Sequence, residues 1–132
     1  NKKMKNIILS LSVIAILAVP SCGEITAQEN NDNKIEVLSS KDFKSKLAGL
    51  KDYQLIDVRT PGECENGVID GAININFQAS DFEEKIASLD KTKPTLVYCA
   101  GGVRSAQAAK KMSKMGFVQI IDLKGGYSSW YE

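Results

Sequence analysis

Histidine is absent from this chain of 132 residues. Its absence excludes a Cys-His or Ser-His catalytic pair, a histidine general base and a histidine-ligated metal site within the chain. A nucleophile in this sequence must therefore be activated by some other group.

Cysteine is scarce as well, because the chain has only Cys22, Cys64 and Cys99. An odd number of cysteines without zinc-type spacing predicts neither a disulfide framework nor a metal site, and no cofactor is expected. The formal net charge is +1, so bulk electrostatics gives no reason to expect a nucleic-acid partner. Hydrophobic residues make up 43% and charged residues 25% of the chain, which is typical of one folded domain.

Residues 1–22 predict an export signal, in which lysines precede an apolar run at residues 7–19 that is short for a transmembrane helix. The run leads into Pro20-Ser21-Cys22, which resembles a bacterial lipobox, so Cys22 is a candidate for lipidation. Cleavage near residues 25–27 with release of a soluble protein, or a retained membrane anchor, are the alternatives. The expected location is the periplasm or the membrane of a bacterial envelope, as a lipoprotein in the second case.

Residues 23–33 are polar and lack apolar periodicity, which predicts a disordered linker. The folded domain is expected at residues 34–132, where strand-like and helix-like segments alternate. This alternation predicts an α/β domain with a mostly parallel sheet. Strands are expected at residues 35–38, 54–58, 72–75, 95–98 and 118–122. Helices are expected at residues 40–48, 80–88 and 103–115, with a short helix that opens at residues 60–61 and a last helical turn near residue 130.

Helix ends have local signals of their own. Ser80 and Glu83 have the spacing of a capping box, which predicts a helix start at Ser80. Gly49 and Gly116 are expected to end the helices that precede them, since glycine readily takes the backbone conformation found after a last turn.

Cys99 directly follows an apolar strand and precedes Gly101-Gly102, Arg104 and Ser105. A glycine-rich turn can aim successive backbone N–H groups at an anion, and the helix N-terminus adds positive potential. Arg104 could add a full charge. Together these groups favour a thiolate, which supplies the activation that histidine cannot. The alternative is a cysteine that is buried at a strand end as a small hydrophobic residue.

Several motifs in series resemble a rhodanese domain, and together they span residues 35–130. The resemblance implies a three-layer α/β domain in which helices flank a mostly parallel central sheet. It also implies a single-domain, monomeric sulfurtransferase. The matching segments are Leu-Ile-Asp-Val-Arg-Thr-Pro at 55–61, Gly-Val-Ile-Asp-Gly-Ala-Ile-Asn-Ile at 67–75, the active-site loop at 98–105, Gly-Phe at 116–117, and Leu-Lys-Gly-Gly at 123–126 with Trp130.

The resemblance implies that Cys99 takes the outer sulfur of a donor such as thiosulfate or a persulfide. The resulting Cys99 persulfide would then give this sulfur to cyanide or to a thiol acceptor. Backbone N–H groups of the loop would cradle the persulfide, and they belong to Ala100, Gly101, Gly102, Val103 and Arg104.

Other residues receive supporting roles from the same resemblance. Arg104 would attract the anionic donor, and Ser105 would support the loop at the helix start. Asp57 and Arg59 would be structural, with Arg59 expected to pair with Glu63 or nearby loop groups.

Loop length separates sulfur transfer from a second chemistry on this fold. Relatives that act on phosphate or arsenate have five residues between Cys and Arg, whereas four residues separate Cys99 from Arg104. A phosphatase or arsenate reductase is therefore the weaker alternative, and a non-catalytic rhodanese-like binding module is another.

The chain departs from the family at three positions. Val68 stands where many members have histidine, and Cys64 stands where an aromatic residue is usual. Cys64 is either a small filler or a resolving thiol for Cys99. Ala100 gives the loop no second cation, which favours a persulfide donor over thiosulfate.

Overall fold

The computed structural model describes residues 34–132. The predicted export signal at residues 1–22, lipidation at Cys22 and the linker at residues 23–33 lie outside the described residues. Within residues 34–132, no helix combines the length and the apolar character that crossing a bilayer requires.

A five-stranded sheet with the order β1-β5-β4-β2-β3 forms the centre of the fold, and every strand pair is parallel. The expected α/β class is thereby confirmed. The strands are Ile35–Leu38 (β1), Gln54–Asp57 (β2), Ile73–Asn74 (β3), Thr95–Tyr98 (β4) and Ile120–Leu123 (β5). The helices are Ser40–Gly49 (α1), Pro61–Cys64 (α2), Phe82–Ala87 (α3) and Val103–Lys114 (α4), with a 3-10 turn at Tyr127–Ser129 (η2).

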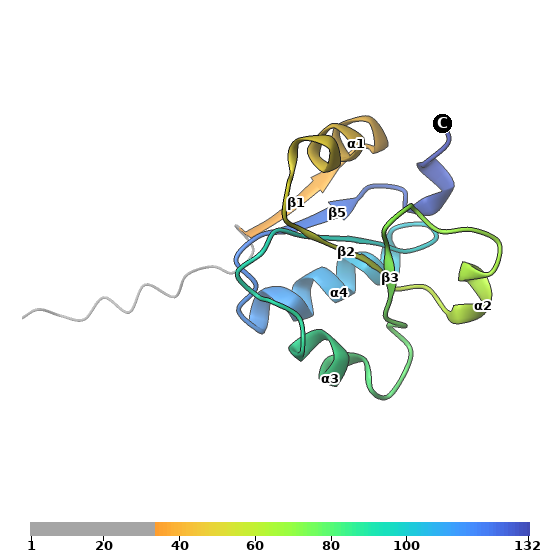
Figure 1. The fold of residues 1–132 in the computed structure, drawn as a ribbon. Helices are drawn as coiled ribbons and strands as arrows, with labels where there is room; N and C mark the ends of the chain where they lie inside the picture. The colour runs from red at the N-terminus through yellow and green to blue at the C-terminus, as the bar shows by residue number, and fades with distance from the viewer. Residues whose placement is uncertain (1–33) are drawn as a thin grey trace, which may run out of the picture.

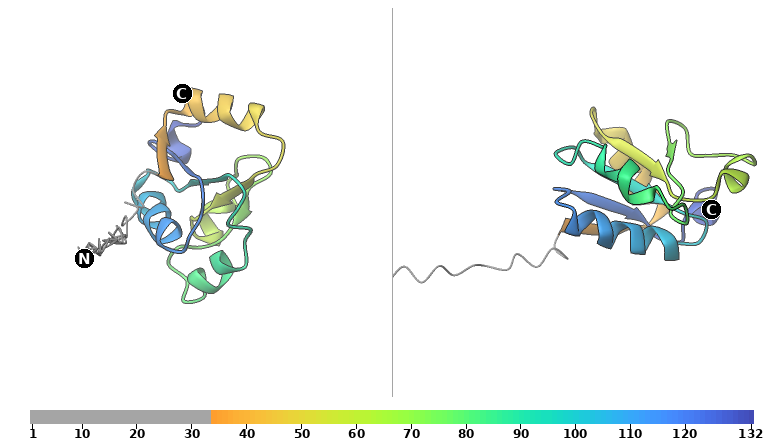
Figure 2. Two further views of the ribbon diagram at one scale, coloured as in Figure 1. Left: turned by 90° about the vertical axis from the view of Figure 1, so that its left-hand side faces the viewer. Right: turned by 90° about the horizontal axis from the view of Figure 1, so that it is seen from below.

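Helices cover both faces of the sheet and produce three layers (Figure 1). Two further views show α1 on one face and α3 and α4 on the other (Figure 2). The central strand β4 is buried along its whole length, as expected of a parallel strand that is covered on both sides. Because all strands run in one direction, their carboxyl ends share one edge of the sheet, where loops can gather functional groups.

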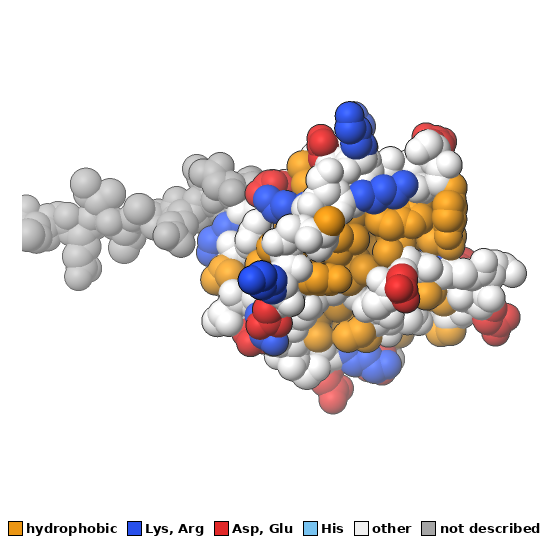
Figure 3. All heavy atoms as spheres, turned by 45° about the horizontal axis from the view of Figure 1, so that its top comes forward, with side chains coloured by type: hydrophobic (Ala, Val, Ile, Leu, Met, Phe, Trp, Pro, Cys, Tyr) orange, Lys and Arg blue, Asp and Glu red, His pale blue; other side chains and the backbone are white. Residues whose placement is uncertain are grey.

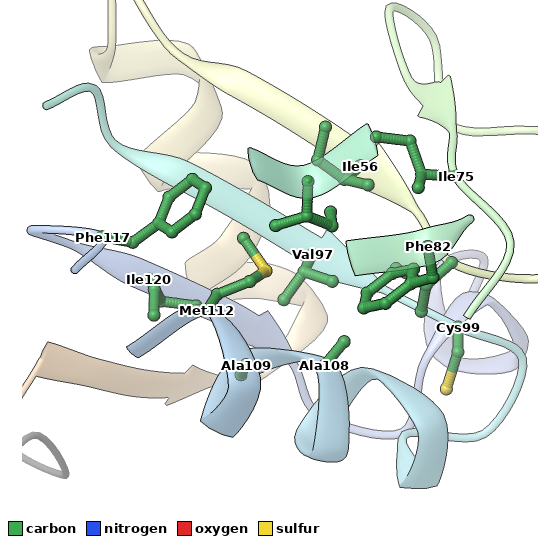
Figure 4. Close-up of a cluster of buried hydrophobic side chains, with 12 residues drawn as sticks. Ile56, Ile75, Phe82, Val97, Cys99, Ala108, Ala109, Met112, Phe117 and Ile120 are labelled. Carbon is green, nitrogen blue, oxygen red and sulfur yellow. The ribbon is translucent and has the colours of Figure 1, made fainter. Parts of the chain in front are cut away.

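Two hydrophobic clusters fill the two interfaces between the layers. Alternate residues of β4 divide between them: Val97 points toward α3 and α4, and Leu96 points toward α1. Figure 4 shows the first cluster, in which Cys99 lies at the end nearest the first turn of α4. On the α1 side the layer is completed by η2 and its neighbours, through Tyr127 and Trp130. Figure 3 shows hydrophobic side chains visible on that side of the molecule.

Most expected elements are found within two residues of their predicted ends, but some helix signals were misplaced. Gly49 is the last residue of α1 and Leu50 caps the helix, so the helix ends one residue later than expected. The capping box predicted at Ser80 is not formed. The N-cap residue of α3 is Asp81, and its side chain makes no capping hydrogen bond. Phe82 is buried in the core and its N–H already donates to Ala79 O, so tertiary packing sets this helix start.

The last strand begins two residues later than expected. Val118 N–H donates to Lys91 O in the loop before β4 instead of joining the sheet. Pairing with the neighbouring strands begins at Ile120, which lies opposite Ile35 of β1 and Thr95 of β4.

Candidate functional site

Cys99 lies at the carboxyl end of β4, and its side chain is 1% exposed. The chain then makes a short loop to Gly102, the residue that caps the start of α4 with a φ of 105°. This left-handed conformation suits glycine and turns the Gly102 N–H back toward the strand end. That N–H donates to Cys99 Sγ at 3.0 Å. The loop therefore presents a backbone donor to the sulfur, as the glycine pair predicted.

Hydrogen bonds set the charge state of the Cys99 thiol. Burial by itself raises the pKa of Cys99. The Ser105 hydroxyl and the backbone N–H groups of Ser105, Gly102 and Gly101 act in the opposite direction, and together they hold the pKa below its ordinary value. Because these donors stabilise the thiolate, the sulfur is activated without histidine.

Arg104 approaches the loop from the first turn of α4, but its charge has a partner. Its guanidinium donates to both carboxylate oxygens of Glu63 in α2, at 2.7 and 2.8 Å. Hydrogen bonding by Arg104 holds the pKa of Glu63 down at about 2. The expectation that Arg104 offers a free charge to the site therefore needs correction, because this guanidinium is already neutralised by Glu63.

Asp57 and Arg59 form a separate ion pair at the carboxyl end of β2. Arg59 Nη2 lies 2.6 Å from Asp57 Oδ2, and both side chains are buried. Of the expected partners, Glu63 or nearby loop groups, Arg59 contacts backbone carbonyls of the loop, and it reaches Glu63 only at its carbonyl, at 3.4 Å. The guanidinium also donates to the Gly67 carbonyl and lies over the ring of Tyr127. These contacts tie the β2 loop to the C-terminal turn, which agrees with the expected structural role.

Cys64 is a hydrogen-bond donor in this same network. Its thiol lies 3.4 Å from Asp57 Oδ2, to which it donates. Burial, together with the charge of Asp57, raises the pKa of Cys64 to about 11. The thiol therefore stays protonated near neutral pH, which disfavours the role of a resolving nucleophile. The alternative of a small filler did not predict its hydrogen bond to Asp57.

The C-terminal turn supports the Cys99 loop from outside, a role that the sequence reasoning missed. Tyr127 N–H donates to Cys99 O at 2.7 Å, and Ser128 N–H donates to Ala100 O at 3.1 Å. A Cβ at Gly126 would lie 2.5 Å from Cys99 O, so only glycine allows this approach. The Gly125-Gly126 pair was the available signal, since two glycines after a last strand indicate close backbone contact.

Asp122 was also missed. It is a lone acid inside the apolar strand β5, and it is 3% exposed. Burial raises the pKa of Asp122 to about 6, and the Ser105 hydroxyl acts to lower it. A carboxyl in a buried apolar strand is itself a sequence signal, because such groups are rarely buried without a partner. Within residues 34–132, no three His, Cys, Asp or Glu side chains gather as a potential metal site.

Comparison with known proteins connects this geometry to a family. Residues 39–132 match the family model described as a rhodanese-like domain. A thiosulfate sulfurtransferase of Shewanella oneidensis, GlpE, is 35% identical over 86 residues, which cover 65% of this chain and 83% of that protein. An uncharacterized protein of Bacillus subtilis, YqhL, is 38% identical over 96 residues, or 73% of this chain and 72% of its own length.

The fold comparison agrees with the sequence comparison. The crystal structure of a rhodanese-related protein from Thermoplasma volcanium matches with a TM-score of 0.64 and 34% sequence identity. The match covers 73% of this chain and 90% of that one.

Proposed function

This chain belongs to the rhodanese-like domain family, whose members include named sulfurtransferases, and on that premise we propose that it carries a sulfane sulfur on Cys99. The observation that carries the proposal is the hydrogen bond from Gly102 N–H to Cys99 Sγ at 3.0 Å. A backbone donor at this distance stabilises negative charge on the sulfur. Because the family includes sulfurtransferases, we propose sulfur transfer as the reaction that uses this negative charge.

The reaction consists of two displacements at sulfur. The Cys99 thiolate attacks the outer sulfur of the donor, an S–S bond forms, and the donor leaves with the electron pair of the bond that breaks. From thiosulfate the leaving group is sulfite, and from a persulfide it is a thiolate. An acceptor nucleophile then attacks the outer sulfur of the persulfide and releases Cys99 as a thiolate. Both steps conserve charge and electrons, and neither needs a cofactor.

The loop around Cys99 favours a persulfide donor over thiosulfate. Arg104 is held by both oxygens of Glu63, and Ala100 adds no cation to the loop. A dianionic donor would therefore meet little unpaired positive charge. A persulfide carries less charge and depends on the backbone N–H groups that already face the sulfur.

Mass spectrometry of the full chain tests the proposal directly. After treatment with an inorganic polysulfide, the wild-type protein is expected to gain one sulfur atom at Cys99, and cyanide is expected to remove it as thiocyanate. Cys64→Ser is the matched control, because its hydroxyl can replace the thiol as a donor to Asp57. It should gain the sulfur as the wild type does, while Cys99→Ser should not.

Two results would favour other functions. Sulfur uptake at neither cysteine would support a non-catalytic rhodanese-like module. Hydrolysis of an aryl phosphate at a rate similar to sulfur transfer would support a phosphatase, against the four-residue spacing between Cys99 and Arg104.

We further propose that the chain is exported and anchored through Cys22, on the pattern of residues 1–22 alone. Mass analysis of the protein purified from cell membranes tests this. A lipidated Cys22 at the mature N-terminus is the expected result, and an N-terminus near residues 25–27 without lipid would contradict it.

A further inference from the structure

Asp122 contains an unpaired polar atom close to the proposed site. Among residues 34–132, Asp122 Oδ1 is the one buried side-chain nitrogen or oxygen atom without a hydrogen-bond partner. A buried carboxylate oxygen with no donor is costly, whereas the carbonyl oxygen of a neutral carboxylic acid costs far less. The orphaned atom therefore fits a carboxyl group that carries a proton.

Asp122 faces the same layer as Cys99. In the sheet it lies beside Val97 of β4, and two residues before it in β5 is Ile120. Val97, Ile120 and Cys99 all belong to the cluster beneath α4 (Figure 4). Because strand side chains alternate, Asp122 points toward α4 as they do.

Ser105 connects the two groups. It is fully buried in the first turn of α4, and its hydroxyl lies 3.5 Å from Cys99 Sγ. The same hydroxyl interacts with the Asp122 carboxyl. The Gly102 carbonyl is a third acceptor for this hydroxyl, at 3.2 Å. A serine hydroxyl has a single proton to donate, so these acceptors compete for it. An ionised Asp122 would draw that proton away from the sulfur. A neutral Asp122 can instead donate to the Ser105 oxygen, which leaves only Gly102 O to compete with Cys99 for the Ser105 proton.

The surroundings favour a negative charge on Cys99 more than they favour one on Asp122. Cys99 has three backbone donors, at Gly101, Gly102 and Ser105. Asp122 has one, at Leu123, and its strand neighbours are uncharged: Val37 on β1 and Val97 on β4. Cys99, two residues after Val97, is the ionisable group on the same side of the sheet. The buried residues of α4 carry no ionisable side chain, and they are Ser105, Ala108, Ala109, Met112 and Ser113.

We propose that Asp122 is a positioning residue that takes up, through Ser105, the proton lost by Cys99 and thereby directs the Ser105 hydroxyl at the thiolate. In this step the Cys99 S–H bond breaks and its proton passes to Ser105 Oγ, while the Ser105 proton passes to the Asp122 carboxylate. A thiol and a carboxylate become a thiolate and a carboxylic acid, and no electrons are exchanged with another molecule. The inference deepens the proposed function and rests on it, because the thiolate is the form that attacks the donor.

Alkylation with iodoacetamide over a range of pH, with Cys99 followed by peptide mass spectrometry, tests the proposal without any sulfur donor. Asp122→Asn should leave the pKa of Cys99 no higher than in the wild type, because the amide can donate to Ser105 as the neutral acid does. Asp122→Val removes that donor, so the alkylation rate below the pKa should fall about tenfold, the effect of one lost hydrogen bond.

Ser105→Ala provides the internal comparison. Its effect should have the same direction, and the double variant with Asp122→Val should lose no more than Ser105→Ala alone, because Asp122 acts through Ser105. The proposal is overturned if Asp122→Val leaves the Cys99 profile unchanged, or if Asp122→Asn impairs it as much as Asp122→Val.

A second measurement needs no substitution at Asp122. Carbon NMR of the Asp122 carboxyl, followed with pH, should show a higher pKa in the wild type than in Cys99→Ser, because the thiolate opposes a second negative charge. Equal titration in both proteins would overturn the coupling. If alkylation and NMR show the coupling but no persulfide forms, the proposed function fails while the role of Asp122 stands. The reverse result rejects the role of Asp122 alone.

Discussion

The segment after β4 (residues 99–102, the β4 loop) and the segment after β2 (residues 58–72, the β2 loop, which includes α2) each contain a cysteine. The pKa values of these two thiols are shifted in opposite directions. Cys99 is the more deeply buried, yet its pKa is lowered, while the pKa of the partly exposed Cys64 is raised to about 11. Cys99 Sγ accepts a hydrogen bond from a backbone N–H, whereas the Cys64 thiol donates one to a carboxylate. Burial raises the pKa of both thiols, and only at Cys99 do hydrogen-bond donors to the sulfur outweigh it.

The two loops also differ in what holds them together. The β2 loop is closed by side-chain charges, since Asp57 and Arg59 neutralise each other in a buried pair. The β4 loop is held mainly by the backbone, through Gly102 and the C-terminal turn. Backbone donors have fixed partial charges and no competing carboxylate, so they remain available to an anion. The charge pair of the β2 loop contributes stability, whereas the backbone N–H groups of the β4 loop stabilise negative charge on the Cys99 sulfur.

The largest expected effect concerns the buried pair of the β2 loop. Arg59→Met leaves the Asp57 carboxylate buried without its partner, which should lower the free energy of unfolding by about 3–5 kcal/mol. Urea unfolding measures the change. Lys93→Met is the matched control, because Lys93 forms an exposed ion pair with Asp52 and should cost under about 1 kcal/mol. Equal costs for both variants would contradict the structural role of Arg59.

The contrast between the thiols gives the next largest effect. At pH 8 a thiol with a pKa of about 11 is ionised in about one molecule in a thousand, so Cys64 should react slowly with iodoacetamide. Cys99 should react at least about a hundredfold faster despite its burial, because its pKa is below the ordinary value. Labelling of Cys64 should rise as the pH approaches 11. Faster labelling of Cys64 at pH 8 would reverse the comparison.

The contact between the C-terminal turn and the β4 loop should be sensitive to one methyl group. Gly126→Ala places a Cβ 2.5 Å from Cys99 O at a residue with a φ of 63°, so we expect a loss of at least about 2 kcal/mol in stability. Gly62→Ala, in the β2 loop, is the control, because a Cβ there meets nothing within 4 Å. Thermal unfolding of both variants measures the difference in stability. A similar loss for Gly62→Ala would contradict the claim that the close contact at Gly126 causes the effect.

The smallest effect concerns the ion pair that joins the two loops. Glu63→Gln should cost under about 1 kcal/mol, because Arg104 and Glu63 are partly exposed to solvent. Since the folded-state pKa of Glu63 is lowered to about 2, its contribution is present above the ordinary carboxyl pKa and is lost as the pH falls toward 2. Chemical unfolding of both proteins at pH 7 and pH 3 should show a smaller difference at pH 3.

Several features were predictable because their causes are local. The strands at 35–38 and 95–98 were predicted to the residue, since short apolar runs bounded by turn residues mark buried strands. The glycine turn after Cys99 followed from backbone freedom at Gly102. Caps were less predictable: Thr60 and Glu63 form a capping box, but Ser80 and Glu83, with the same spacing, do not. Packing of Phe82 into the core decides that case.

Charge partners could not be predicted from spacing. Arg59 was expected to pair with Glu63, four residues away, or with nearby loop groups, but the Glu63 carboxylate pairs with Arg104, which is 41 residues away. Sequence spacing alone favours the nearby Arg59, and the packing of α2 near α4 instead brings Glu63 to Arg104. Asp122 was missed for the same reason, because its relation to Ser105 exists only after β5 packs beneath α4.

The sequence by itself determined the α/β fold, the place of Cys99 at a strand end and the lack of histidine to activate it. These depend on residue type, order and local backbone preference. Tertiary structure alone decided which arginine is neutralised by Glu63, which thiol donates to Asp57, and which acid lies behind Ser105. Those features are charges and hydrogen bonds between distant segments, and their energies depend on distances and burial that exist only once the sheet and its helices are assembled.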